Sequence, residues 1–383
     1  MVCLSVRSGF DLLLDALSLP IGSEVLVSAI THPDMVRIIE QHGLIAVPVD
    51  LDIATLAPRV ELLELGRTSR TRAILVAHLF GGRVDLEPIS NFAKKHNLLL
   101  IEDCAQAFRS PRDAGDSLAD VSMFSFGFIK TASALGGALL YVRDPGTLRK
   151  MCIRQSFWPV QSRLGYSGKL LRALCLVQAT RPIVFGFLFR ACELLGEDFD
   201  ALVNGVARAF PAKGQPPARD RRPDRPLPAA LFTRIRCRPS APLLALLARR
   251  LHTFDAARLA RRGRVGEEVA RRLSPALPHP GSLAEARTHW LFPVIVPDPD
   301  YLISALRREG FDAARATSNI AAVEAPADHA DSSPTRAVWM MSHLVFLPVY
   351  PELPETEIVR LIQLVNEAAE KVDWGAACEN KMS

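Results

Sequence analysis

An acidic residue that follows an apolar run is the first feature of this chain that could do chemistry. The residue is Asp103 in the segment IEDCAQ. A carboxylate at the end of a buried strand stays ionised only beside a cation or hydrogen-bond donors. A protonated pyridinium nitrogen is such a cation, and the pairing makes the ring an electron sink for carbanion chemistry. The structural alternative is that Asp103 only caps the turn that follows.

A lysine stands after the next apolar run, in the segment FSFGFIK. A lysine amine forms a Schiff base with an aldehyde, and a desolvated position favours its neutral, nucleophilic form. Ser125 lies five residues before Lys130 and could bind a phosphate oxygen. A surface lysine at the junction of a strand and a loop is the alternative explanation.

A possible phosphate site also lies near the N-terminus, in SGFDLLLDAL. Gly9 precedes a helical pattern, and backbone N–H groups at the start of a helix can bind phosphate. Many helices begin in this way, so the segment indicates a phosphate site only when it is considered together with Asp103 and Lys130.

The elements that position these residues alternate between strands and helices over residues 1–150. Apolar runs predict strands at 24–30, 45–52, 73–80, 98–104, 121–126 and 138–142, and helical periodicity predicts helices at 36–43 and 87–97. This alternation indicates βαβ units and an α/β fold with a mostly parallel sheet. Ligands bind at the carboxyl ends of such strands, where Asp50, Asp103 and Ser125 fall.

The rest of the chain has a different organisation. Residues 169–195 look helical, 211–228 read as a Pro- and Arg-rich linker, and one long Leu/Arg helix is expected over 241–273. The segments 290–296, 301–310, 344–350 and 355–372 indicate a small α+β domain. We therefore expect a large domain over 1–240, with an apolar, Arg-rich insertion at about 155–230, and a connecting helix and small domain over 241–383.

Composition narrows the class of protein. The net charge of +5 is spread along the chain without a Lys/Arg block, so we expect no nucleic-acid partner. The seven cysteines show no CxxC pair and no metal-ligand spacing, which predicts free thiols in a reducing cytoplasm and no metal site. The N-terminus lacks the basic leader and apolar core of a secretory signal. The uncharged stretches 173–180 and 182–189 fall far short of the roughly 20 residues that a membrane span needs.

Taken together, these segments resemble the DegT/DnrJ/EryC1/StrS aminotransferase family, the sugar aminotransferases of pyridoxal 5'-phosphate (PLP) fold type I. The matching pieces occur in the family's order at 8–52, 72–108, 115–142, 236–251 and 344–358. IEDCAQA, HLFG, the Ser-x4-Lys spacing and LPVYP occur together, which makes the match specific. The resemblance implies an aspartate-aminotransferase-like large domain with a mostly parallel sheet, followed by a smaller C-terminal α+β domain.

The resemblance also implies PLP as the cofactor and assigns the residues around its ring. Lys130 matches the lysine that holds the cofactor and then moves the proton as general base and acid. Asp103 matches the acid at the pyridine nitrogen, and Gln106 lies against the ring or its phenolic oxygen. His32 stands where relatives have an aromatic residue that covers the ring face.

The phosphate group is assigned in the same way. Ser125 matches the phosphate serine, and the helix-start loop matches Ser8, Gly9 and Phe10. Relatives have threonine at Phe10, so one hydroxyl contact is lost. Arg236 replaces the asparagine with which relatives reach the phosphate of the partner subunit, and an arginine can serve that role more strongly.

The activity implied by the resemblance is transfer of an amino group from an amino acid, typically glutamate in that family, to a keto sugar that is usually nucleotide-linked. Such an enzyme would act in polysaccharide biosynthesis as a cytoplasmic homodimer. Two alternatives stay open: a PLP enzyme of another reaction type, and a non-catalytic or regulatory relative that keeps the fold. Phe10 and a start close to the phosphate helix favour the non-catalytic relative, whereas the joint presence of Lys130, Asp103, Gln106 and Ser125 argues against it.

The insertion allows two interpretations, because it interleaves arginine with leucine, phenylalanine and valine. Residues 165–210 could make a peripheral contact with a membrane that carries an apolar substrate. Alternatively, the insertion adds helices that pack on the domain or on the dimer interface.

Overall fold

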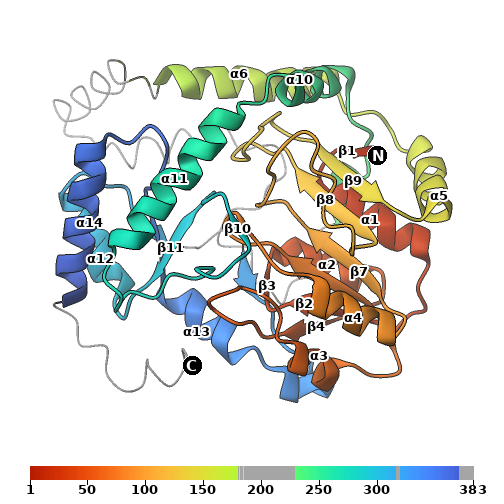
Figure 1. Cartoon of the computed structure of the whole chain (residues 1–383). Helices are drawn as coiled ribbons and strands as arrows, with labels where there is room; N and C mark the ends of the chain where they lie inside the picture. Colours follow the sequence, from red (N-terminus) through yellow and green to blue (C-terminus); the bar gives the residue numbers. More distant parts are fainter. Residues whose placement is uncertain (180, 182–183, 185–228, 316–319, 371–383) are drawn as a thin grey trace.

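A seven-stranded sheet forms the centre of the N-terminal part in the computed structural model (Figure 1). The structure describes residues 1–179, 181, 184, 229–315 and 320–370. The strand order is β1-β9-β8-β7-β5-β2-β4, and only β9 runs against the other six. The strands are β1 (Val2–Cys3), β2 (Glu24–Ser28), β4 (Ile45–Val49), β5 (Thr71–Ala77), β7 (Leu99–Asp103), β8 (Val121–Ser125) and β9 (Ala138–Val142). The predicted α/β fold with a mostly parallel sheet is confirmed.

Helices cover both faces of this sheet. Successive residues of a strand point to opposite sides, so one strand contributes apolar side chains to two separate cores. Val25 of β2 joins a core with α1 (Val6–Leu17), α2 (Pro33–Gln41) and α5 (Pro145–Ser156). Leu26, the next residue, joins a separate core with α3 (Val60–Gly66) and α4 (Glu87–Lys95). The uninterrupted apolar run that predicted β2 is therefore a strand buried on both faces, whereas β9 at the side of the sheet exposes Tyr141.

The C-terminal part has a three-stranded antiparallel sheet of its own. Its order is β11 (Phe292–Ile295), β14 (Leu344–Leu347) and β12 (Ala314–Arg315). Apolar residues of α11 (Ala256–Arg272), α12 (Pro299–Arg308) and α14 (Glu355–Glu370) share one core with this sheet. This arrangement fits the predicted small α+β domain, and the domain boundary near residue 240 stays a prediction.

The long helix expected over 241–273 is wrong in one respect, because the structure divides it in two. α10 (Ala241–His252) ends before Thr253, and α11 begins after Asp255. The side chain of Asp255 accepts the backbone N–H of Arg258 at 2.8 Å, which caps the second helix. From this cap, α11 runs away from α10 and along the C-terminal part (Figure 1).

Two short antiparallel ladders join the N-terminal and C-terminal parts. β10 (Ala286–Arg287) pairs with β6 (Gly82–Arg83), and β13 (Ala321–Ala322) pairs with β3 (Ile30–Thr31). Asp50, which follows β4, accepts the backbone N–H groups of Arg336 at 2.8 Å and Ala337 at 3.0 Å. Asp50 thereby caps α13 (Thr335–His343) and has a structural role.

The insertion is described only in part. Its first helix is α6 (Arg163–Ala179), and α9 (Ala229–Ile235) precedes α10. The buried ring of Tyr166 anchors α6, since its hydroxyl donates to the carbonyl oxygen of Ala134 at 2.7 Å. The remainder of the helix predicted over 169–195, apart from residues 181 and 184, and the linker predicted over 211–228 lie outside the described residues. In the part of the chain that is described, no helix is both long and apolar enough to cross a membrane.

Candidate active site

The topology brings the predicted chemical residues to one edge of the central sheet. Asp103 ends β7 and Ser125 ends the neighbouring strand β8, with Asp103 opposite Met123 in the ladder. β1 runs in the same direction as β8, so the segment that leads from β1 into α1 starts at this edge too. In parallel sheets the carboxyl ends of the strands bind ligands.

Asp103 is a buried carboxylate with few hydrogen bonds. Its Oδ1 atom accepts the backbone N–H of Ala105 at 2.9 Å. Burial raises the pKa of Asp103 above its usual value, and this bond and the charge of Lys130 only partly oppose the rise. Asp103 therefore caps the following turn, as the structural alternative proposed, and it also faces the charge of Lys130. One function does not exclude the other.

Lys130 lies in the turn that follows β8. Its backbone N–H donates to the carbonyl oxygen of Gly127 at 3.1 Å. Burial of the side chain lowers the pKa of Lys130 to about 8, against the opposing charge of Asp103. Lys130 is thus not the freely solvated surface lysine of the alternative explanation, and much of its amine is neutral in mildly alkaline solution.

Trp290 is a contact of Lys130 that the sequence did not identify as a site residue. The Nζ atom of Lys130 lies 4.3 Å from the centroid of the Trp290 ring. The indole N–H donates to the carbonyl oxygen of Ile129 at 3.2 Å. Trp290 precedes β11, far along the chain from Lys130, and no spacing or motif in the sequence connects the two positions. Only the packing of the C-terminal part on the sheet reveals this contact.

Gln106 is oriented by the loop beside it. Its Oε1 atom accepts the backbone N–H of Phe80 at 2.9 Å. Because the oxygen is engaged there, the amide nitrogen is the group of Gln106 that can donate to a ligand. The predicted position against a cofactor ring or its phenolic oxygen is not tested by this geometry and stays a prediction.

His78 belongs to a buried charge cluster under this edge of the sheet. Its Nδ1 atom accepts the backbone N–H of Val84 at 3.0 Å, so Nε2 carries the proton and donates to Glu102 at 2.8 Å. Burial raises the pKa of Glu102, but the hydrogen bond from His78 and the charge of Arg83 are among the interactions that outweigh it and lower the pKa to about 2. His78 is a satisfied histidine rather than a free acid or base.

The same cluster has the composition of a possible metal site. Ligand atoms of His78, Glu102 and Cys104 lie within 4.8 Å of one another. The guanidinium of Arg83 donates to Glu102 at 3.1 Å and to the sulfur of Cys104 at 2.9 Å. The positive charge among these three groups is therefore supplied by arginine, which indicates a structural role for the cluster.

The start of the first helix differs from the prediction by three residues. α1 begins at Val6, and the hydroxyl of its N-cap Ser5 accepts the backbone N–H of Ser8 at 3.2 Å. Gly9 lies inside the helix, and its N–H donates to the carbonyl oxygen of Ser5 at 3.0 Å. A phosphate at this helix start would therefore meet Ser5, Val6 and Arg7 rather than Ser8, Gly9 and Phe10.

Packing explains why glycine stands at position 9. A Cβ atom on Gly9 would lie 2.4 Å from Cδ1 of Leu140 in β9. Ser8 and Phe10 are also buried, and Phe10 belongs to the core beneath the sheet. Gly9 thus permits close approach of helix and sheet, which is a different reason for glycine than phosphate binding.

His32 is half-buried at the N-cap of α2. Its Nδ1 atom accepts the backbone N–H of Asp34 at 3.1 Å. Arg7, in the first turn of α1, donates to Asp34 at 2.6 Å, so the two helix starts meet here. The predicted stacking of His32 on a cofactor ring stays a prediction.

Arg236 forms an ion pair within its own chain. Its Nε and Nη2 atoms donate to the two carboxylate oxygens of Asp11 at 2.9 and 2.8 Å. Asp11 is fully buried in α1, and His42 also contacts it at 3.0 Å. A buried carboxylate requires a cation, so Arg236 is engaged within its own chain, and the predicted role at the partner's phosphate stays a prediction.

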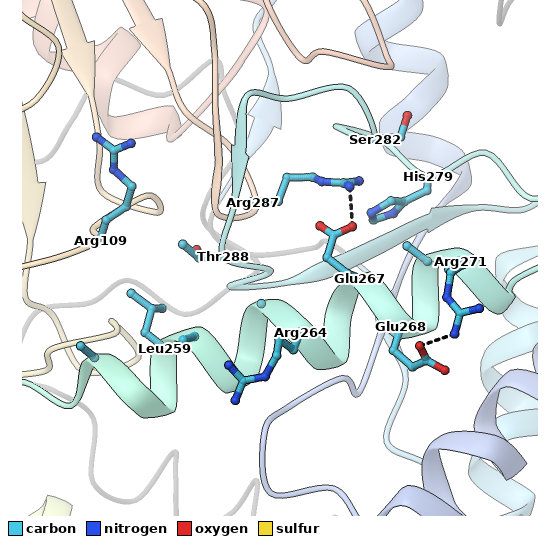
Figure 2. A pocket seen from close by; sticks show the side chains of 14 residues that line it. Arg109, Leu259, Arg264, Glu267, Glu268, Arg271, His279, Ser282, Arg287 and Thr288 are labelled. Atoms are coloured by element: carbon cyan, nitrogen blue, oxygen red, sulfur yellow. Dashed lines mark hydrogen bonds and ion pairs between the residues drawn. The ribbon is translucent and has the colours of Figure 1, made fainter.

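A cavity of about 980 Å³ lies between α11 and the segment around β10 (Figure 2). Its charged lining consists of four arginines and two glutamates, namely Arg109, Arg264, Arg271, Arg287, Glu267 and Glu268. Glu267 pairs with Arg287 and Glu268 with Arg271, each at 2.5 Å. None of the predicted cofactor residues lines the cavity, but Thr288 does, two residues before Trp290.

Comparison with known sequences identifies relatives of the N-terminal part. Residues 2–170 match the model of the DegT/DnrJ/EryC1/StrS aminotransferase family. The dTDP-3-amino-3,6-dideoxy-alpha-D-galactopyranose transaminase of Aneurinibacillus thermoaerophilus is 39% identical over 129 residues, which are 32% of this chain and 36% of that protein. The GDP-perosamine synthase of Escherichia coli O157:H7 is 36% identical over 140 residues, 36% of this chain and 38% of that protein. The chain thus spans less than half the length of these curated relatives.

Solved structures with the same fold cover almost the whole chain. The S. venezuelae DesV structure in complex with a ketimine intermediate has a TM-score of 0.65 and 21% identity, covering 97% of this chain and 85% of that one. The Bacillus subtilis NtdA structure with bound cofactor PMP has a TM-score of 0.65 and 16% identity, covering 97% and 73%. At this level of identity the likeness establishes the fold and nothing about substrates.

Proposed function

We propose that the chain is a PLP-dependent aminotransferase, because residues 2–170 match the model of the DegT/DnrJ/EryC1/StrS aminotransferase family. It moves an amino group from an amino acid, glutamate in the first instance, to the keto group of a nucleotide-linked sugar. The observation that carries the proposal is the pair formed by Lys130 and Asp103 at the carboxyl edge of the sheet, where burial perturbs the pKa of both groups. Paired groups with perturbed pKa values at a ligand-binding edge favour a catalytic site.

The donors at this edge fit PLP. Lys130 offers an amine with a pKa of about 8 to the cofactor's aldehyde, and buried Asp103 offers a carboxylate to its ring nitrogen. Ser125 and the start of α1 at Ser5, Val6 and Arg7 offer hydroxyl and N–H donors to its phosphate. When bound, PLP withdraws electrons from the substrate carbon.

Each residue then has a defined task. Asp103 would hold the ring nitrogen of a bound cofactor, because a carboxylate beside that nitrogen favours its charged form. Lys130 would hold and move a proton at its Nζ atom, for which a pKa of about 8 is suitable. Gln106, whose oxygen is held by the Phe80 N–H, presents its amide nitrogen to the ring substituent.

The cavity along α11 supports an anionic acceptor. Its arginines exceed its glutamates, and its volume of about 980 Å³ is at the upper end of small-molecule sites. Thr288 connects its lining to Trp290, which contacts Lys130. We propose that the phosphates of the nucleotide-linked sugar bind along Arg264, whose guanidinium, unlike those of Arg271 and Arg287, is not engaged by a glutamate in the cavity.

The proposed enzyme is a cytoplasmic homodimer of polysaccharide biosynthesis. Among the described residues, Cys3, Cys104, Cys152, Cys175 and Cys237 are free thiols, which is consistent with a reducing compartment. α6 presents leucines to solvent, and contiguous exposed apolar side chains mark contact surfaces. Of the two interpretations of the insertion, we propose the dimer contact, with a peripheral membrane contact as the alternative.

An absorbance spectrum tests the function. The purified protein mixed with PLP should gain a visible band that borohydride removes and that Lys130→Ala lacks. Glutamate should then convert the cofactor to its amine form without a sugar present. A colourless wild-type protein that takes up no PLP would favour a non-catalytic relative, and a band that glutamate leaves unchanged would favour another PLP reaction.

A further inference from the structure

Trp290 contacts the loop of Lys130 at two points. The Nζ atom lies 4.3 Å from the centroid of the indole ring, within the roughly 6 Å over which a cation is attracted to a ring face. The indole N–H donates to the carbonyl oxygen of Ile129, next to the lysine, at 3.2 Å. The same side chain thus holds both the backbone of the loop and the end of the lysine.

Arg262 fixes the segment that carries Trp290. This buried residue of α11 donates from Nε to the carbonyl oxygen of Thr288 at 2.8 Å. Its Nη2 atom donates to the hydroxyl of Thr131 at 3.2 Å. Arg262 therefore binds residues on both sides of the contact, one just before Trp290 and one just after Lys130.

The loop itself offers the lysine little support. Phe128 and Ile129, the two residues before Lys130, each expose 55% of their surface. A lysine side chain has four rotatable bonds and loses considerable rotamer entropy when it is held in one place. Contacts from outside the loop therefore help to hold the half-buried Lys130 side chain in one place.

We propose that Trp290 is a positioning residue that keeps the Lys130 amine in the site whenever that amine is not bonded to the cofactor, with Arg262 fixing the ring in place. This inference rests on the proposed role of Lys130. In a transaminase the amine must leave the cofactor and return to the same point in each turnover. An aromatic face within reach holds the released ammonium without a strong bond that would prevent its return.

The first test uses the protein without cofactor. Reductive methylation of Lys130 over a range of pH, followed by peptide mass spectrometry, gives the midpoint at which the amine becomes reactive. Without the ring the amine reaches solvent, so we expect Trp290→Leu to move the midpoint upward by about one unit, toward the ordinary lysine value. Trp290→Phe, which keeps an aromatic face, should stay closer to the wild type.

Two results would overturn the proposal. An unchanged midpoint in both variants would mean that Trp290 does not hold the amine. A lower midpoint in Trp290→Leu would mean that the amine stays buried and has lost only a neighbouring ring. Unfolding would also raise the midpoint, so the free energy of unfolding of each variant is measured beside it, and only a variant that stays folded across the labelling range reports on positioning.

The second test measures PLP affinity by absorbance titration. Freeing one long side chain should weaken binding by about threefold to tenfold in Trp290→Leu, with partial recovery in Trp290→Phe. Trp158→Leu is the matched control, since Trp158 packs against the core of α1 and the central sheet. Equal affinity in all variants would contradict the proposal. If the wild type binds no PLP, the proposed function fails, while the methylation midpoints still decide the role of Trp290.

Discussion

Asp103 and Lys130 influence each other's protonation at the edge of the sheet. Burial raises the pKa of the carboxyl group and lowers that of the amine, and the attraction between the two charges opposes both shifts. The amine therefore combines two properties that a catalytic lysine needs, a neutral fraction near pH 8 and a nearby negative charge that retains its protonated form.

Removal of the negative charge should make Lys130 more acidic. Asp103→Asn eliminates the carboxylate that stabilises the ammonium, so we expect the methylation midpoint to fall below about 8 by roughly one unit. The control is Asp144→Asn, a neutralisation of the exposed N-cap of α5, which should leave the midpoint unchanged. A midpoint that did not move in Asp103→Asn would show that the two groups are not electrostatically coupled.

At the scale of elements, α1 combines close packing on the sheet with a helix start at the proposed site. A Cβ atom on Gly9 would overlap Leu140, so Gly9→Ala must push α1 away from β9. We expect it to lower the free energy of unfolding by about 1–3 kcal/mol, measured by urea denaturation.

Gly168→Ala is the matched helical control for that measurement. Gly168 lies in α6, and a Cβ atom there would meet nothing within 4 Å. Alanine in an open helical position should stabilise the protein by roughly 0.5–1 kcal/mol. If Gly9→Ala proved as stable as Gly168→Ala, the helix and sheet would not be as closely packed as the structure has them.

The ion pair between Asp11 of α1 and Arg236, which follows α9, gives a second prediction at this scale. Arg236→Ala leaves the buried carboxylate of Asp11 without its bidentate partner, so we expect a loss of about 3–5 kcal/mol of unfolding free energy. Arg236→Lys should recover part of it. Both variants are compared without and with PLP, because a role at the partner's phosphate would lower PLP affinity and leave the unloaded protein stable.

Elements could be predicted from this sequence, but contacts between distant elements could not. Strands such as β7 and β8 are apolar runs whose burial on both faces leaves a local pattern, and Asp103 and Lys130 follow them directly. The packing of Gly9 against Leu140 and the ion pair of Arg236 with Asp11, 225 residues away, leave no local pattern. The contact between Trp290 and Lys130 could not be predicted for the same reason, since no local pattern encodes a contact made by folding.

At the scale of the whole molecule, the cavity between α11 and β10 of the C-terminal part is also lined by Arg109 of the N-terminal part. If it holds the acceptor's phosphates, Arg264→Ala should weaken dTDP or GDP binding several-fold in calorimetric titrations, as expected for loss of one charged hydrogen bond. Arg261→Ala, also on α11 but outside the cavity lining, is the control. Equal binding by both variants and the wild type would remove the acceptor from this cavity.

The exposed face of α6 is the contact surface proposed for the insertion. α6 carries Arg163, Lys169 and Arg172 and no acidic residue, and its exposed apolar residues are Leu164, Leu170, Leu171, Leu174, Leu176 and Val177. Leu164 and Leu171, 86% and 63% exposed, lie two helical turns apart and therefore share one face. A second copy of the chain would bury this face, whereas an anionic membrane would contact both its leucines and its cations.

Light scattering and vesicle flotation distinguish these partners. For a dimer contact, the double variant Leu164→Glu, Leu171→Glu should shift the protein toward monomer, while Ile153→Glu, an exposed change on α5, should not. Neither the full chain nor a chain lacking residues 165–210 should then float with anionic vesicles. The other outcome is that the full chain floats, the double variant does not, and the oligomeric state is unchanged. This outcome would assign α6 to a membrane surface, because the added carboxylates repel anionic lipid.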